Sequence, residues 1–181
     1  KYFNGELNEK VFRSNIFKKE DLEMGGGVEK SHTRTFLKIQ DGCNSFCTYC
    51  IIPYARGKSR SIPMANLVAR VNELYAEGVR EVVLTGVHIG DYEDAMFGQT
   101  KTMEDLVETL LVKTHMPRFR LSSLEPIELS DRLLELYQDD KMCPHFHMSI
   151  QSANTDVLAN MKRKYTQKDV IDSLSKIYKR L

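Results

Sequence analysis

Short apolar runs alternate with amphipathic helical patterns along most of the chain. Four runs rich in apolar and β-branched residues have the length of buried strands, and they predict strands at residues 36–40, 81–85, 119–123 and 145–150. Helical spacing fills the intervals between the runs. Because parallel neighbours need a long crossover connection, strands that alternate with helices predict a parallel sheet with helices over its outer face.

Four helices are predicted from apolar residues that recur at intervals of three and four. Their apolar positions are, in chain order, Leu67, Val71 and Leu74; Met103, Leu106, Val107, Leu110 and Leu111; Leu133, Leu136 and Tyr137; and Val170, Leu174, Ile177, Tyr178 and Leu181. Gly78 is a stop signal for the first helix. Thr102-Met-Glu-Asp105 and Thr166-Gln-Lys-Asp169 have the spacing of capping boxes at the second and last.

Four strand-helix repeats are too few to close an eight-stranded barrel. The sequence therefore predicts an α/β fold, an open partial (β/α) barrel with a parallel sheet and helices outside, and we expect it to be truncated. We assign residues 35–181 to this core, incomplete at its C-terminus. Residues 1–34 are expected to be the tail of a preceding N-terminal domain, joined by a glycine-rich linker at Met24-Gly-Gly-Gly27.

Composition excludes few functions. Net charge is +1, so any contact with nucleic acid must depend on local basic clusters. No apolar run has the length needed to cross a bilayer, and the first residues lack an apolar signal core, so no membrane partner is expected. Three of the four cysteines fall within eight residues, which is typical of metal binding in a reducing compartment and predicts a cytoplasmic protein.

The pattern C-x3-C-x2-C, formed by Cys43, Cys47 and Cys50, gives three thiolates that can bind one metal centre. Three ligands leave one iron of a four-iron cluster without a protein ligand. A structural zinc site is the alternative, and it needs a fourth ligand. The residues that could supply that ligand are Cys143, His88, His145 and His147.

With Tyr49 just before its last cysteine, this pattern resembles the signature of radical S-adenosylmethionine (SAM) enzymes. The resemblance implies that the three cysteines hold a [4Fe-4S] cluster whose open iron chelates the amino and carboxylate groups of S-adenosyl-L-methionine. An electron from the cluster then cleaves the sulfonium and gives a 5′-deoxyadenosyl radical.

Longer segments resemble the methylthiotransferases of this superfamily. They are Leu37-Lys-Ile-Gln-Asp-Gly-Cys43, Ile52-Pro-Tyr-Ala-Arg-Gly57, Leu84-Thr-Gly-Val-His88, Ser122-Ser-Leu-Glu125, Gln151-Ser152 and Met161-Lys-Arg-Lys-Tyr-Thr166. They look most like the branch that methylthiolates carbon 2 of N6-threonylcarbamoyladenosine in tRNA. This implies tRNA and an electron donor protein as partners. The alternatives are a sister branch acting on isopentenyladenosine in tRNA or on a ribosomal protein aspartate, and a zinc-stabilised RNA-binding module.

The resemblance also implies roles for six residues. Gly86 would approach the amino group of S-adenosylmethionine, and Glu125 would bind its ribose hydroxyls. Arg163, with Gln151, would bind its carboxylate, and Tyr49 would stack near its adenine. His88 would contact cofactor or substrate. Each residue type suits its role, since a carboxylate accepts from a diol and an arginine binds a carboxylate with two nitrogens. Each role has a plain structural alternative. Gly86 and His88 would then be turn residues, and Glu125 and Arg163, the latter within Lys162-Arg-Lys164, would be solvated surface charges.

The chain departs from the family pattern in two places. The family's second [4Fe-4S] cluster, held by three cysteines of an N-terminal domain, has no counterpart here, so we expect S-adenosylmethionine cleavage without complete methylthiolation. Gln151-Ser-Ala-Asn replaces the usual Gln-Ser-Gly.

Beside the cysteine loop, the basic residues Arg56, Lys58 and Arg60 with Tyr54 form an arm that could meet the phosphates and bases of an anticodon loop. The alternative is that these charges only keep the surface soluble. We expect Phe46 to pack inward and Cys143 to be a small buried residue at a strand start.

Overall fold

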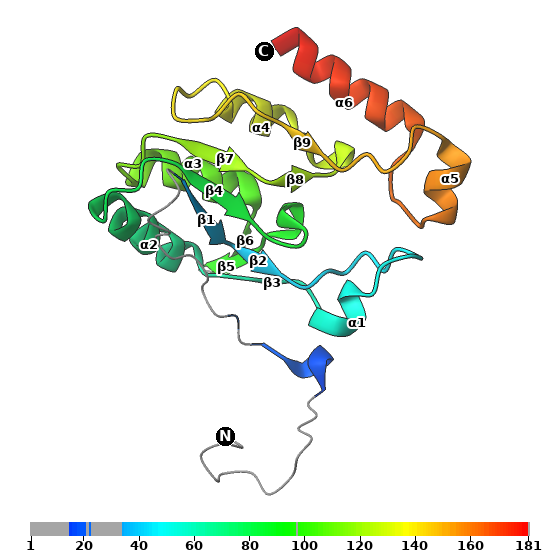
Figure 1. Cartoon of the computed structure of the whole chain (residues 1–181), viewed down its shortest axis with the longest axis horizontal. Coiled ribbons are helices and arrows are strands. Elements are labelled where there is room, and N and C mark those ends of the chain that lie inside the picture. The colour runs from blue at the N-terminus through cyan, green and yellow to red at the C-terminus, as the bar shows by residue number, and fades with distance from the viewer. Residues whose placement is uncertain (1–14, 21, 23–33, 97, 181) are drawn as a thin grey trace, which may run out of the picture.

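A parallel sheet runs through the middle of the computed structural model (Figure 1). Its strands are β1 (Thr35–Lys38), β4 (Val82–Thr85) and β7 (Phe119–Leu121), in the order β1-β4-β7. After Ser122 the chain continues as β8 (Ser123–Leu124), which pairs in parallel with β9 (His147–Met148). Parallel pairing at all four predicted positions confirms the sheet expected from the sequence.

The structure describes residues 15–20, 22, 34–96 and 98–180. The linker predicted at Met24–Gly27 and the last apolar position of the final helix, Leu181, lie outside the described residues. The division into a tail at 1–34 and a core at 35–181 stays a prediction.

All four predicted helices are present: α2 (Met64–Ala76), α3 (Met103–Lys113), α4 (Asp131–Leu136) and α6 (Gln167–Arg180). Two short helices, α1 (Ile52–Arg56) and α5 (Thr155–Asn160), were not predicted. Three 3₁₀ turns are η1 (Ile16–Lys18), η2 (Ile89–Asp91) and η3 (Pro126–Glu128). Two antiparallel pairs complete the fold, β2 (Gln40–Asp41) with β3 (Arg60–Ser61) and β5 (Asp94–Met96) with β6 (Gln99–Lys101).

The main core lies between the sheet and the row of helices α2, α3 and α4 (Figure 1). The predicted apolar faces supply it, and Leu67, Leu106 and Leu133 are fully buried against strand residues such as Leu84. Each buried leucine contributes about 2 kcal/mol by removal of apolar surface from water. Gly78, with φ +97°, ends α2 as predicted, because its backbone conformation is left-handed.

The last helix departs from its predicted packing. Val170 is buried, but Leu174 and Tyr178 are exposed. A polar residue is buried beside Val170, since Ser173 Oγ donates a hydrogen bond of 2.7 Å to the Pro126 carbonyl of η3. The apolar stripe of α6 is therefore only partly covered by the described residues.

The fourth strand is also shorter than predicted. Pro144 has no N–H to donate, and the His145 N–H bonds back to the Cys143 carbonyl at 2.7 Å, so a turn occupies the first part of the predicted segment. Among the described residues β9 pairs with β8 alone, which leaves the sheet open, as expected. None of the described helices combines the length and apolar character needed to span a bilayer.

Candidate functional site

The cysteine loop joins β2 to α1 at the carboxyl end of β1 (Figure 1). Gly42 lets this loop close on itself, because its φ is +77° and a Cβ there would lie 2.1 Å from the Lys58 carbonyl oxygen. The Cys43 N–H donates to the Gly57 carbonyl at 3.2 Å, and the Cys50 N–H to the Cys47 carbonyl at 3.0 Å. The backbone thereby gathers the three cysteines in one place.

All four cysteines are free thiols, and three of them line one cavity of about 230 Å³. Residues from several strand ends complete its wall. The predicted site residues found there are Cys43, Cys47, Cys50, Tyr49, His88, Glu125, Gln151 and Arg163. Gln151 takes the left-handed conformation, at φ +56°. The structure thus brings together eight of the nine site residues predicted from the sequence.

Gly86 is the residue that the structure does not bring into this cavity. It lines the neighbouring one, of about 430 Å³, together with Gln40 and Ile52. A Cβ at Gly86 would lie 2.8 Å from the Gln40 carbonyl oxygen and 2.9 Å from its Oε1. Close packing on Gln40 explains this glycine.

Arg163 connects two predicted cofactor residues. Its Nη1 forms a short ion pair with Glu125 Oε1, and its Nη2 donates to the Tyr49 hydroxyl oxygen at 2.5 Å. The side chain is 11% exposed, so the reading of Arg163 as a solvated charge is wrong. Glu125 is buried as well, and burial raises its pKa against the opposing effect of the positive charges of His88 and Arg163.

His88 lies among three carboxylates and one thiol. Its Nδ1 is 3.1 Å from Asp91 Oδ2 and 3.8 Å from Cys43 Sγ, and its Nε2 is 2.5 Å from Glu128 Oε1. Burial disfavours the imidazolium, but contacts with Asp91, Cys43 and Glu128 outweigh it and raise the pKa of His88 to about 12. His88 is therefore a cation inside the site, and its reading as a plain turn residue is wrong.

Two of the loop thiols differ in their ease of ionisation. Burial disfavours the Cys43 thiolate, yet hydrogen bonds from His88 and the Ser45 N–H outweigh it and lower the pKa of Cys43. Burial raises the pKa of Cys47, although the Arg163 guanidinium opposes this rise. Since metals bind the thiolate, Cys43 is the better prepared of these two ligands.

Three residues of the site were missed from the sequence. Gln40 is fully buried, and its amide accepts from the Val87 and His88 N–H groups at 3.1 and 2.9 Å while donating to the Gly42 carbonyl at 2.8 Å. A polar residue ending an apolar run was the available signal. Glu128 follows Glu125 at capping-box spacing and accepts its N–H at 2.7 Å. Asp91 had no distinguishing signal.

Three expectations about neighbouring residues can be compared with the structure. Phe46 does not pack inward: it is exposed, its backbone is left-handed at φ +48°, and its ring contacts the exposed Tyr54 at 5.5 Å between centroids. Arg56 pairs with Asp41 at 3.1 Å but is 56% exposed, so its contact with phosphates stays a prediction. Cys143 is buried as expected, and its N–H donates to the Phe119 carbonyl at 2.8 Å.

The donor set fits a metal centre with an additional ligand. Three sulfurs line the cavity, and Arg163 Nε is a buried donor without a hydrogen-bond partner among the described residues. A buried donor of this kind can bind a polar ligand or a water molecule. Of the residues considered as a fourth zinc ligand, only His88 lines this cavity. Cys43, His88 and Asp91, which lies outside the cavity wall, offer ligand atoms within 4.8 Å of one another.

Similar proteins include several tRNA-modifying enzymes. The threonylcarbamoyladenosine tRNA methylthiotransferase MtaB of Rickettsia prowazekii is 40% identical over 146 residues, which is 80% of this chain and 35% of that protein. MtaB of Bacillus subtilis is 38% identical and covers 98% of this chain and 38% of that protein. The tRNA-2-methylthio-N(6)-dimethylallyladenosine synthase of Staphylococcus epidermidis is 36% identical over 83% of this chain and 29% of that protein. The chain thus spans between 29% and 38% of the length of these relatives.

Among solved structures, the radical S-adenosylmethionine methyltransferase TsrM from Kitasatospora setae, with cobalamin and a [4Fe-4S] cluster bound, superposes with a TM-score of 0.64. Sequence identity is 16%, and the match covers 80% of this chain and 28% of that chain, so the likeness shows the fold alone. The family model described as "Radical SAM superfamily" matches residues 37–181. By this match, and with three cysteines lining one cavity at a strand end, the chain belongs to the radical SAM superfamily.

Proposed function

We propose that this chain is the radical domain of a tRNA methylthiotransferase that acts on carbon 2 of N6-threonylcarbamoyladenosine. The observation that carries the proposal is the cavity where the three cysteines meet Glu125, Arg163 and Tyr49. The names of the Rickettsia and Bacillus relatives support the substrate. The Staphylococcus relative, named for another adenosine modification, supports the sister substrate less strongly at 36% identity.

In this proposal Cys43, Cys47 and Cys50 hold the cluster, and the superfamily implies both a [4Fe-4S] cluster and S-adenosylmethionine as cofactors. When bound, this pair supplies one-electron chemistry that removes a hydrogen atom from the substrate. Arg163 binds the carboxylate of S-adenosylmethionine in this proposal, because its Nε has no hydrogen-bond partner among the described residues and can donate to that group. Glu125 is the buried acceptor for a diol, and the exposed ring of Tyr49 stacks on a base.

Gly86, His88 and Gln151 have supporting roles in the proposal. His88 and Gln151 line the cavity and bind cofactor or substrate. Gly86 acts from the next cavity by letting the segment after β4 pack on Gln40. In the proposal the inserted sulfur comes from a second [4Fe-4S] cluster. Cys143, the one cysteine of the sequence outside the cysteine loop, is buried away from the site and is not a ligand of that cluster. An electron donor protein, tRNA and a cytoplasmic location complete the proposal.

Anaerobic reconstitution with iron and sulfide tests the cofactor part. We expect a cluster that dithionite reduces, and 5′-deoxyadenosine when S-adenosylmethionine is added. Cys47→Ala should lose both the cluster and the 5′-deoxyadenosine. Cys143→Ala should retain both, because it also removes a buried thiol but lies away from the cysteine loop. Stoichiometric zinc with no reducible cluster would overturn the proposal in favour of a zinc-stabilised module.

Mass spectrometry of tRNA tests the substrate. Cells that lack the gene for the whole protein should lack 2-methylthio-N6-threonylcarbamoyladenosine and regain it when the gene is restored. Loss of the isopentenyladenosine product instead would assign the protein to the sister branch.

A further inference from the structure

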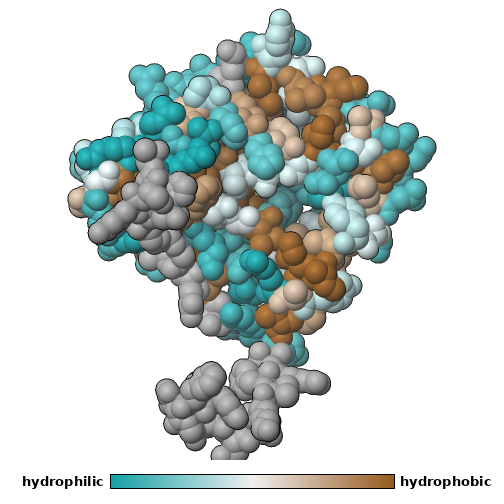
Figure 2. Space-filling model, viewed as in Figure 1, coloured by the Kyte–Doolittle hydropathy of each residue, from teal (hydrophilic) through white to brown (hydrophobic). Residues whose placement is uncertain are grey.

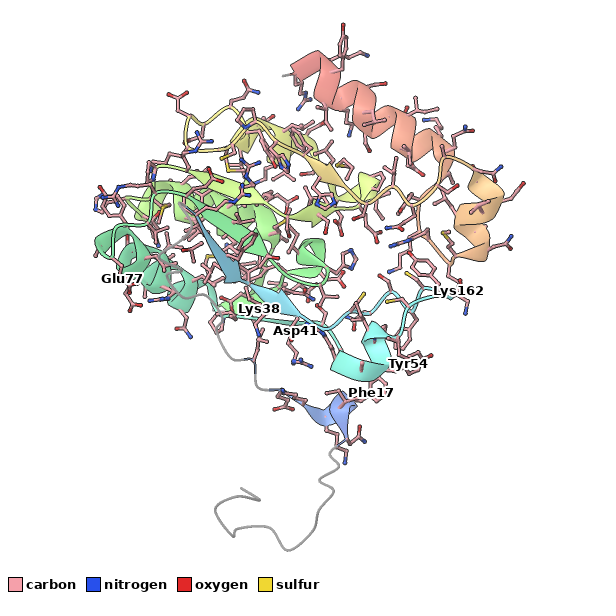
Figure 3. All side chains as sticks on the ribbon, viewed as in Figure 1. Phe17, Lys38, Asp41, Tyr54, Glu77 and Lys162 are labelled. Atoms are coloured by element: carbon pink, nitrogen blue, oxygen red, sulfur yellow. The ribbon has the colours of Figure 1, made fainter. Side chains whose placement is uncertain are left out.

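Three aromatic rings form an exposed cluster beside the cysteine loop. Tyr54, on the outer side of α1, contacts Phe46 edge to face at 5.5 Å between ring centroids and Phe17 of η1 at 6.5 Å. All three rings are exposed, and Tyr54 is 58% exposed. Figure 2 shows hydrophobic side chains gathered over this end of the molecule, and Figure 3 shows Phe17 beside Tyr54. We call Phe17, Phe46 and Tyr54 the aromatic platform.

Cationic side chains surround the aromatic platform. Among the described residues, no carboxylate pairs with Lys18, Lys19, Lys58 or Arg60. Within the described part of the chain, the Arg60 guanidinium bonds only to backbone carbonyls, those of Arg56, Lys58 and Lys19 at 3.0, 3.2 and 3.5 Å. These hydrogen bonds fix the guanidinium without neutralising its charge. Four cations without a carboxylate partner among the described residues therefore adjoin the aromatic platform, in a chain whose net charge is only +1.

The aromatic platform adjoins the candidate site through α1. Ile52, the first residue of that helix, lines both the cysteine cavity and the neighbouring cavity, while Tyr54 projects from the same helix to solvent. A polymer held on the platform therefore lies next to the opening where the reaction is proposed to occur. Exposed rings with unneutralised cations suit unpaired nucleotides, since bases stack on aromatic faces and phosphates attract lysine and arginine.

We propose that Phe17, Phe46 and Tyr54, with Lys18, Lys19, Lys58 and Arg60, form the surface that binds the unpaired loop of the RNA substrate. This inference rests on the proposed function, whose substrate is tRNA, and adds where the loop is held. The rings stack on unpaired bases without selecting among them, and the lysines bind the flanking phosphates. Base-paired RNA offers no free base faces and is bound less well.

Fluorescence anisotropy with a labelled RNA hairpin and a fully paired duplex of equal length tests this surface. We expect Tyr54→Ala to weaken hairpin binding by about tenfold. Tyr54→Leu keeps the apolar contact with Phe17 and Phe46 but removes the stacking face, so it should weaken binding comparably. Lys58→Ala should reduce the slope of log affinity against log salt by about one. The matched control is Tyr178→Ala, a 90% exposed tyrosine on α6 at the other end of the molecule, which should bind as the parent does (Figure 1).

Thermal unfolding of each variant checks that the fold is retained. The proposal is overturned if the parent chain does not prefer the hairpin, or if Tyr54→Ala binds within twofold of the parent. The proposal is also overturned if Tyr54→Leu binds the hairpin as the parent does while Tyr54→Ala does not. That result would mean that the surface needs apolar contact but no stacking face, which is what a protein partner requires. Binding is measured without a cofactor and with unmodified RNA. The result therefore does not depend on which adenosine modification is the substrate or on whether the cluster is active, and the two proposals can fail separately.

Discussion

At the scale of single residues, Arg163 joins two parts of the candidate site through its guanidinium group. Its two terminal nitrogens contact Glu125 and Tyr49 separately. Lysine has one nitrogen and cannot keep both contacts in this geometry. We therefore expect Arg163→Lys to weaken S-adenosylmethionine binding by the reconstituted chain about tenfold, measured by anaerobic calorimetry. Arg132→Lys, at an exposed pair with Glu108, is the control and should leave the affinity unchanged.

Gly42 and Gly78 form a natural pair for a second prediction, because both have positive φ. A Cβ at Gly42 would lie 2.1 Å from a backbone oxygen, whereas one at Gly78 meets nothing within 4 Å. Gly78→Ala should lower the free energy of unfolding by about 1 kcal/mol through backbone strain alone. Gly42→Ala should cost a further 1–3 kcal/mol or so, because the loop must open. Equal losses in urea unfolding would show that the loop adapts without cost.

At the scale of elements, α3 is held at its first turn. Asp105 accepts the Thr102 N–H at 2.9 Å and also pairs with Arg132 of α4 at 2.9 Å. Asp105→Ala should lower the free energy of unfolding by about 1 kcal/mol. Asp105→Asn keeps the cap acceptor and loses only an exposed ion pair, so it should recover most of that loss. If urea unfolding shows equal losses for the two variants, the ion pair and not the cap stabilises α3.

The sequence was most informative where one physical rule dominates. Helical periodicity placed α2 and α3, and the cap spacing of Thr102 with Asp105 was right, because local pattern and burial agree there. Periodicity also placed α6 and its buried Val170, but it did not predict that Ser173 would be buried and Leu174 exposed. The short helix α1 was missed, because five residues beginning at Ile52-Pro53 carry no helical period.

The same contrast applies to the site. Spacing predicted the three cysteines, since metal ligation requires nearby thiolates in one loop. The partners of His88 were not predictable, because Asp91 and Glu128 approach it only through the folded arrangement of η2 and η3. Resemblance supplied Arg163, and its contact with Glu125, 38 residues away in the sequence, became visible only in three dimensions.

At the scale of the whole molecule, Glu81 ties the starts of two strands together. Its carboxylate accepts from Arg118 Nε at 3.0 Å and Arg120 Nε at 3.1 Å, linking the start of β4 to β7. Burial alone would raise the pKa of Glu81, but the two arginines outweigh it and hold this pKa below its ordinary value of 4.5. The stabilisation is therefore complete above that value and is lost as pH falls through the lower pKa of the folded state.

Glu81→Gln should consequently lower the free energy of unfolding by about 1 kcal/mol at neutral pH. The difference from the parent should shrink as the pH falls through the lowered pKa of Glu81, because the parent then loses the charge as well. Urea unfolding at a series of pH values measures this. Glu135→Gln, at an exposed position on α4, is the control and should track the parent throughout. A difference independent of pH would mean that the Glu81 charge does not provide the stabilisation.

The buried amide of Gln40 has a consequence for how the site opens. One side chain holds the Gly42 carbonyl before the cysteines and the Val87 and His88 N–H groups after β4. Neither segment can move away without breaking bonds to the same group, so the two should fluctuate as one cooperative unit. Hydrogen-deuterium exchange at Val87 and His88 then reports on the order of the cysteine loop from outside it, and loading of the site should slow both amides together.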